Sequence, residues 1–167
     1  MALDGIFLSK VKDEIKLNAV GTRIDKVNQP TKDEILLSLR GKGCNYKLLI
    51  CVRADSPRLH FTSHAISNPP VPPMFCMLMR KHLSGAKVVG IEQFGLERFL
   101  HISFSTYNEF GDPVIIKLAV EIMGRHSNIM LIGPDGKIID AIKRVTADMS
   151  SVRQVMPGMT YVFPPAQ

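Results

Sequence analysis

The sequence predicts an α+β fold, namely a β-rich sandwich or flattened barrel with two main helices packed on it. Two segments place apolar residues at helical spacing, whereas eight or nine short apolar segments are bounded by Gly, Pro, Asn and Asp. The 167 residues fall within the range of one domain, and a composition of 46% hydrophobic and 22% charged residues is typical of globular proteins. These observations exclude a wholly disordered chain.

The first predicted helix covers residues 4–18, with Asp4 as its N-cap, because a short carboxylate there accepts hydrogen bonds from the unpaired N–H groups of the first turn. Its apolar row consists of Leu3, Phe7, Val11 and Ile15, with Leu8 and Ala19 beside it. The second helix covers residues 74–83 and follows a proline-rich connector. Its predicted core face consists of Phe75, Leu78, Met79, His82 and Leu83. Arg80 and Lys81 lie off that face.

All the other elements are predicted strands. Before the second helix they cover residues 23–28, 34–40, 46–52 and 58–62; after it they cover residues 87–93, 98–105, 114–121, 128–132 and 137–142. The last residues, 163–167, read FPPAQ, which is typical of the start of a linker. We therefore expect residues 1–167 to form the first domain of a longer protein.

Composition also predicts where the protein works. The sequence shows no signal peptide and no apolar run near the roughly 20 residues that a membrane-spanning helix needs. Its three cysteines form no CxxC pair, which favours a reducing compartment. We expect a cytoplasmic protein with no membrane partner, no cofactor and no metal, and we find no pairing of a nucleophile with a base that indicates an enzyme.

The whole net charge of +6 lies in residues 40–98. The basic residues of this segment are Arg40, Lys42, Lys47, Arg53, Arg58, Arg80, Lys81, Lys87 and Arg98, and the acidic ones are Asp55, Glu92 and Glu97. We expect these cations to form one shared patch that includes Arg98. Such a patch favours a polyanion, because every phosphate that it neutralises releases a condensed counterion. The alternative is a solvated basic face without a partner.

Two local patterns are candidates for binding. Arg98 is the first residue of a predicted strand whose next residues on the same face are apolar, so we expect its guanidinium at the rim of the core. There it would bind phosphates or base edges, or form a salt bridge with a neighbour such as Glu97. The run MGRHSN at residues 123–128 contains Arg125 and His126 at a bend. Its side chains bind an anion or, on the reading that we favour, satisfy buried backbone groups.

Five motifs occur in a recognisable order: MALDG at residues 1–5, GTRI at 21–24, the proline-rich connector before RKHL at 80–83, GLER at 95–98, and MGRHSN at 123–128. With them the chain resembles, from end to end, the N-terminal (NFACT-N) domain of the fibronectin-binding protein A-like/RqcH/NEMF family. The resemblance implies a fold similar to the N-terminal domain of formamidopyrimidine-DNA glycosylases. Helix-hairpin-helix, coiled-coil and NFACT-R segments would normally follow, and they are absent from this sequence.

The resemblance also implies a role in ribosome-associated quality control. Family members bind the large ribosomal subunit, with its rRNA, when peptidyl-tRNA obstructs it, and they recruit tRNA, in bacteria alanine tRNA, for untemplated tailing of the stalled chain. Peptide-bond formation belongs to the ribosome, so the domain is expected to be an RNA-binding module and not an enzyme. One family name implies an alternative, a surface adhesin that binds fibronectin.

The resemblance assigns roles to individual residues. The acidic position of the family near the N-terminus matches Asp4, and its Asp-Arg pair matches Glu97 and Arg98, where the carboxylate is one methylene longer. We expect Arg98, Arg80 and Lys81 to contact tRNA, with Asp4 and Glu97 positioning basic groups. Arg125 and His126 complete the candidate set. The glycosylase relatives use an N-terminal Pro as nucleophile, whereas this chain begins MAL, which argues against base excision.

Overall fold

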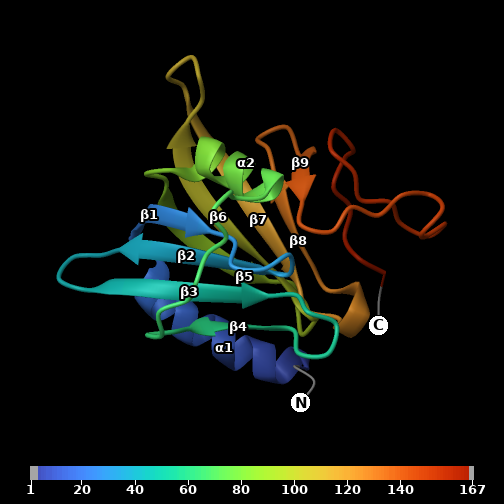
Figure 1. Cartoon of the computed structure of the whole chain (residues 1–167), viewed down its shortest axis with the longest axis horizontal. Coiled ribbons are helices and arrows are strands. Elements are labelled where there is room, and N and C mark those ends of the chain that lie inside the picture. The colour runs from blue at the N-terminus through green and yellow to red at the C-terminus, as the bar shows by residue number, and fades with distance from the viewer. Residues whose placement is uncertain (1–3, 166–167) are drawn as a thin grey trace.

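The computed structural model describes residues 4–165 (Figure 1). Its elements, in chain order, are α1 (Gly5–Ala19), β1 (Arg23–Asn28), β2 (Glu34–Arg40), β3 (Asn45–Cys51), β4 (Arg58–Phe61), α2 (Met74–Leu83), β5 (Lys87–Gln93), β6 (Phe99–Tyr107), β7 (Pro113–Glu121), the 3₁₀ turn η1 (Gly124–His126), β8 (Asn128–Ile132) and β9 (Ile138–Ala141). The predicted class, α+β and rich in β-structure, is confirmed. Residues 166 and 167, the end of the predicted linker start, lie outside the described residues.

The strands form one antiparallel sheet in the order β4-β3-β2-β1-β5-β6-β7-β8-β9. The strands at its two ends, β4 and β9, are not paired with each other, so the sheet is open in the described part of the chain. The ladder between β1 and β5 contains one residue pair, Arg23 with Lys87, and four backbone hydrogen bonds surround that pair. This narrow junction divides the sheet into one half that contains β1–β4 and another that contains β5–β9.

Both halves contribute to one hydrophobic core. Alternate residues of β2 (Ile35, Leu37 and Leu39) and of β6 (Leu100, Ile102 and Phe104) belong to the same buried cluster. The helices complete this cluster, with α1 packed on β4 and β5 and α2 packed on β1, β6 and β9 (Figure 1). The sheet is therefore folded so that its two halves enclose a shared interior. The face that each half turns toward this interior is apolar.

Helix α1 begins as predicted, because the Asp4 side chain accepts a hydrogen bond of 2.7 Å from the backbone N–H of Phe7. The predicted apolar row is wrong at Phe7, which is 48% exposed, whereas its neighbour Leu8 is fully buried. The buried residues of α1 are Gly5, Leu8, Ile15 and Ala19, so the predicted positions of Leu8, Ile15 and Ala19 on the apolar face are confirmed. Gly5 lies on this buried face, where a Cβ atom would overlap the Leu96 carbonyl. Leu3 lies outside the described residues.

A β-bulge in β1 changes the direction of its side chains. Ile24 pairs with Leu39 and Lys26 pairs with Ser38, so Asp25 is an extra residue in β1. The insertion lets Ile24 and Val27, three residues apart, both point into the core, and it turns Lys26 outward beside Ser38. A matching irregularity in β5 lies between Val88 and Gly90.

The three cysteines differ in exposure. Cys44, in the turn between β2 and β3, is exposed, whereas Cys51 and Cys76 are buried.

Within residues 4–165, neither helix has both the length and the apolar character needed to cross a membrane.

Candidate nucleic-acid interface

The loop between β5 and β6 carries Glu97 and Arg98, and it packs against the first turn of α1. The Gln93 side-chain amide donates one hydrogen bond to the Gly5 carbonyl (3.0 Å) and another to the Glu97 carbonyl (2.8 Å). A Cβ atom at position 5 would overlap the carbonyl oxygen of Leu96, so the loop and the helix meet backbone to backbone. Asp4, the N-cap of α1, therefore lies next to the loop that carries Glu97 and Arg98.

Arg98 lies in a bend immediately before β6, which begins at Phe99 and not at Arg98 as predicted. The Arg98 side chain is half-buried, as expected for a residue at the rim of the core. Its backbone carbonyl accepts a hydrogen bond of 2.8 Å from the Ile122 N–H. This bond places Arg98 beside the end of β7, where the MGRHSN segment begins.

The two readings of the MGRHSN segment apply to different residues within it. Ser127 and Asn128 are buried and satisfy backbone groups: the Ser127 hydroxyl accepts from the Met123 N–H at 2.8 Å, and the Asn128 amide donates to the Lys143 carbonyl at 2.8 Å. Arg125 and His126 instead are exposed, with the Arg125 Nε 3.4 Å from the His126 Nε2. The buried pair shapes the bend, and the exposed pair is available to a ligand.

We call Asp4, Glu97, Arg98, Arg125 and His126 the loop cluster, because the three segments that carry them are joined by the backbone contacts described above. Arg80 and Lys81 lie elsewhere. The Arg80 guanidinium donates to the Val27 carbonyl (2.7 Å) and to the Asn28 side chain (3.0 Å), which ties α2 to the end of β1. From the pair Arg23–Lys87, β1 runs in one direction to Asn28 and β5 runs in the opposite direction to the loop that carries Glu97 and Arg98. Arg80, at the end of β1, therefore lies away from the loop cluster.

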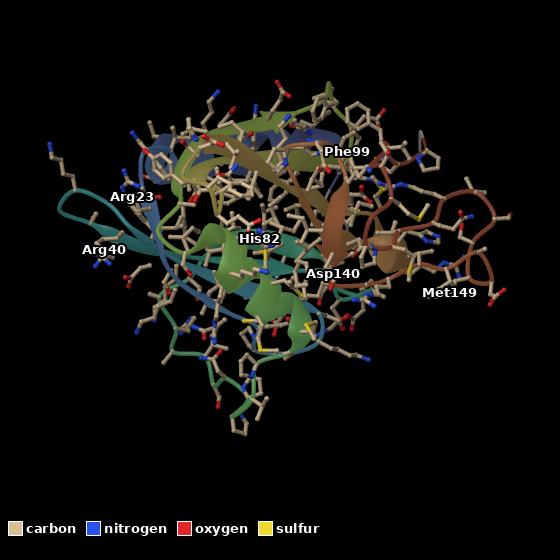
Figure 2. All side chains as sticks on the ribbon, turned by 90° about the horizontal axis from the view of Figure 1, so that it is seen from above. Arg23, Arg40, His82, Phe99, Asp140 and Met149 are labelled. Carbon is tan, nitrogen blue, oxygen red and sulfur yellow. The ribbon has the colours of Figure 1, made fainter. Side chains whose placement is uncertain are left out.

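The cations of residues 40–98 do not gather around Arg98. Arg40 pairs across the sheet with Arg23, which in turn pairs with Lys87. Figure 2 shows Arg23 and Arg40 together at one side of the molecule, well separated from Phe99, the neighbour of Arg98. The prediction of a single shared basic patch that includes Arg98 is therefore wrong, because the strand register carries these side chains to different ends of the sheet.

Sequence reasoning missed a buried polar network behind the loop cluster. Glu121, at the end of β7, is 1% exposed and accepts two hydrogen bonds from the Arg153 guanidinium, at 2.7 and 2.8 Å. The Tyr161 hydroxyl donates to the same carboxylate at 3.0 Å and lies 3.2 Å from Nε2 of His101. A carboxylate at the end of an apolar strand signals such a network, but its partners lie 32 and 40 residues further along the chain.

Burial changes the pKa of two members of this network. Desolvation lowers the pKa of His101 to about 4, with a smaller contribution from the positive charge of Lys117. Desolvation, followed by the negative charge of Glu121, raises the pKa of Tyr161 far above its usual value. His101 is therefore neutral and Tyr161 protonated at neutral pH, which suits a structural network better than a proton-transfer site.

Aromatic rings connect the network to the loop cluster. Phe163 packs on Phe94, in the β5–β6 loop, with ring centroids 4.7 Å apart, and on Phe99 at 5.1 Å. His101 and Tyr161 border the same aromatic group. The segment around Tyr161 and Phe163 thus supports the loop at Phe94, while Gly5 contacts it at Leu96. Among residues 4–165, no group of three or more His, Cys, Asp or Glu side chains is placed to hold a metal ion.

A family model described as NFACT N-terminal and middle domains matches residues 4–167. The chain belongs to the NFACT family. This NFACT chain is 44% identical over 168 residues to Rqc2 homolog RqcH of Bacillus subtilis, an alignment that covers 100% of the chain and 30% of that protein. It is 24% identical over 148 residues to the human ribosome quality control complex subunit NEMF, covering 89% of the chain and 13% of that protein.

Solved structures give the same result for the fold. The N-terminal domain of fibronectin-binding protein PavA from Streptococcus pneumoniae superposes with a TM-score of 0.94 at 37% identity, covering 99% of this NFACT chain and 63% of that one. The N-terminal part of the fibronectin/fibrinogen-binding protein from Streptococcus suis also gives 0.94, at 41% identity, with 99% and 62% covered. The predicted family membership is confirmed, and the chain spans 30% of the length of its Bacillus relative.

Proposed function

We propose that this chain is the RNA-binding module of a ribosome quality-control factor, and that its loop cluster binds tRNA on the obstructed large ribosomal subunit. The relatives named for ribosome quality control support this role. The bound tRNA is alanine tRNA, and its recruitment supports untemplated alanine tailing of the stalled chain. The reaction itself belongs to the ribosome.

The observation that carries the proposal is the fixed position of the loop bearing Glu97 and Arg98. Hydrogen bonds from Gln93, the backbone contact with Gly5 and the ring of Phe163 hold this loop on several sides. A loop that is already ordered loses little entropy when the arginine that it carries binds a phosphate or a base edge. The exposed Arg125 and His126, on the adjoining segment, extend the surface that a tRNA loop would contact.

Binding of alanine tRNA to the full-length protein tests this proposal. We expect Arg98→Ala to weaken binding by about tenfold or more, because a hydrogen bond to a charged group contributes roughly 1.5–3 kcal/mol. Fluorescence anisotropy over a range of salt concentrations measures both the affinity and its salt dependence. Arg53→Ala, which removes an exposed cation from the loop between β3 and β4, is the matched control and should bind like wild type. Equal affinities of Arg98→Ala and wild type would remove Arg98 from the interface.

The names of the two structural neighbours favour a second candidate function, binding to fibronectin at the cell surface. Protease treatment of intact cells separates the two functions. A ribosome quality-control factor stays intact and co-sediments with large ribosomal subunits after lysis. A surface adhesin is degraded and does not co-sediment.

A further inference from the structure

A groove runs over the outer face of β1, β2 and β3, the face that turns away from the hydrophobic core. Its floor includes Lys26, Ser38, Arg40 and Lys47, and its other wall is formed by residues 61–68, which include Thr62, Ser63 and Asn68. Figure 1 shows the segment after β4 crossing over β3, β2 and β1 on its way to α2. The groove therefore has a strand floor and a wall made by the connector.

The strand register brings the cations of this groove together. Lys26, Ser38 and Lys47 form one cross-strand row, because Lys26 pairs with Ser38 and Ser38 pairs with Lys47. Neighbouring strands lie about 4.8 Å apart, so the Cα atoms of the two lysines are roughly 10 Å apart on either side of Ser38. The bulge at Asp25 is essential to this row, because without the extra residue Lys26 would pair with Leu37 and face the core.

A second row, next to the first, adds more positive charge. Arg40 pairs directly with Arg23, and Arg23 pairs directly with Lys87, so three exposed cations lie side by side across β2, β1 and β5. Figure 2 shows two of them, Arg23 and Arg40, at the same side of the molecule. Like charges directly opposite each other destabilise a sheet. Arg40 has a compensating carboxylate in Asp25, and Arg23 donates to the Gly85 carbonyl at 3.1 Å. A polyanion would relieve the remaining repulsion.

The groove is strongly biased toward positive charge. Asp25 is its one carboxylate among the described lining residues, and it is already paired with Arg40. Lys26 and Lys47 form no ion pair with any residue in the described part of the chain. The floor and the wall also carry short side chains with amide or hydroxyl groups, namely Asn28, Ser38, Asn45, Thr62, Ser63 and Asn68. The remaining lining residues are apolar or aromatic, namely Leu36, Leu39, Tyr46, Phe61 and Ile66. The amide and hydroxyl groups hydrogen-bond to phosphates, riboses and 2′-hydroxyls, which an acidic peptide lacks.

We propose that this groove, which we call the strand groove, binds the sugar–phosphate backbone of a single-stranded RNA segment. We take a single strand as the occupant because the groove is small, with a volume of about 780 Å³, and residues 61–68 wall it on one side. Figure 2 shows Arg40, which lines the groove, well separated from Phe99, the neighbour of Arg98 in the loop cluster, so the two surfaces contact different RNA segments. This inference goes beyond the proposed tRNA site and does not depend on it.

The test uses the full-length protein and a fluorescently labelled 15-nucleotide oligouridine. We expect Lys26→Glu/Lys47→Glu to weaken binding at least tenfold, and Lys26→Ala/Lys47→Ala to weaken it less. Each phosphate contact contributes about 0.7 to the slope of log K against log salt for a single strand, so the alanine pair should reduce that slope by about 1.4. Lys10→Glu/Lys137→Glu, which changes the net charge equally at two exposed positions outside the groove, is the matched control.

Photo-crosslinking with a 4-thiouridine oligomer, followed by peptide mapping, locates the bound strand. Crosslinks within residues 26–47 or 61–68, lost in the Lys26→Glu/Lys47→Glu variant, support the proposal. Crosslinks confined to residues 94–98 and 123–126 would overturn it, as would equal loss of affinity in the Lys10→Glu/Lys137→Glu control. Competition by poly-glutamate as strong as that by unlabelled oligouridine would assign the groove to acidic peptides instead. Arg98→Ala should leave this crosslink unchanged, so failure here and failure of the tRNA proposal are distinguishable.

Discussion

At the scale of single residues, Gly5 determines how closely α1 approaches the β5–β6 loop. Its missing side chain allows the Leu96 carbonyl to contact the helix backbone, and the Gly5 carbonyl accepts from Gln93. Asp4 and Glu97 belong to one surface only because of this contact. The position of two charged groups therefore depends on the smallest residue in the chain.

We predict that Gly5→Ala moves the β5–β6 loop. The added methyl meets backbone, which cannot rotate away, so we expect a loss of stability of about 1–3 kcal/mol, typical of overpacking. Binding of alanine tRNA should weaken under conditions where the variant is still folded. Urea unfolding and fluorescence anisotropy measure the two effects. Lys10→Ala, on the exposed face of the same helix, should change neither, and a Gly5→Ala variant identical to wild type would show that the contact is dispensable.

The buried imidazole of His101 predicts a loss of stability in acid. Its folded pKa is about 4, and its Nδ1 lacks a hydrogen-bond partner among the described residues. Below about pH 6.5 the unfolded chain binds a proton at this histidine that the folded chain does not bind until about pH 4. The contribution of neutral His101 to the free energy of unfolding is therefore complete above about pH 6.5 and is lost as the pH falls toward 4. The total loss from this group is about 3 kcal/mol.

Urea unfolding at about pH 7 and pH 4.5 checks this prediction for His101. Comparison with His101→Gln isolates the contribution of His101, because every other titrating group is common to both proteins. The variant should lose about 2–3 kcal/mol less than wild type between the two pH values. Parallel pH dependences would show that the imidazole is not kept neutral by burial.

At the scale of elements, the Glu121–Arg153 pair connects the end of β7 to the C-terminal segment. The guanidinium also donates to the Val162 carbonyl at 2.7 Å and lies 5.4 Å from the centre of the Tyr161 ring. One arginine thus organises both the buried carboxylate and the segment whose Phe163 supports the β5–β6 loop.

We predict that Arg153→Met destabilises the fold by about 3–5 kcal/mol, because it leaves the buried Glu121 carboxylate without its charge partner. Glu121→Gln/Arg153→Met should be less damaging, since no unpaired charge remains. Lys12→Met, which breaks an ion pair with the exposed Asp13, is expected to cost less than about 1 kcal/mol. Thermal unfolding and limited proteolysis of residues 150–165 measure these effects. Similar stabilities of the Arg153 and Lys12 variants would contradict a structural role for the pair.

Most elements could be predicted from the sequence because apolar spacing and turn residues act locally. The bounds of α2, β1, β2, β5 and β8 match the prediction residue for residue. Long-range partners could not be predicted in this way. Nothing near Arg80 in the sequence indicates that its guanidinium binds Val27 and Asn28, more than 50 residues earlier. The similarity to glycosylase N-terminal domains and the roles of the loop cluster remain predictions.

At the scale of the whole molecule, the two halves of the sheet share one core, although the ladder that joins them contains only one residue pair. We therefore predict that residues 1–167 unfold in one cooperative transition, with no stage at which β5–β9 persists without β1–β4. Circular dichroism and tyrosine fluorescence during urea unfolding should give coincident curves. Two separated transitions would show that the halves are independent.

The exposed thiol of Cys44 gives this chain a natural position for a spectroscopic label. It lies in the turn that follows Arg40 and precedes Asn45, at the rim of the strand groove, while the other two thiols are enclosed in the interior. A maleimide dye would therefore attach at one known place without any engineered cysteine. Its emission would report whether an oligonucleotide has entered the groove, in a protein whose sequence is otherwise untouched.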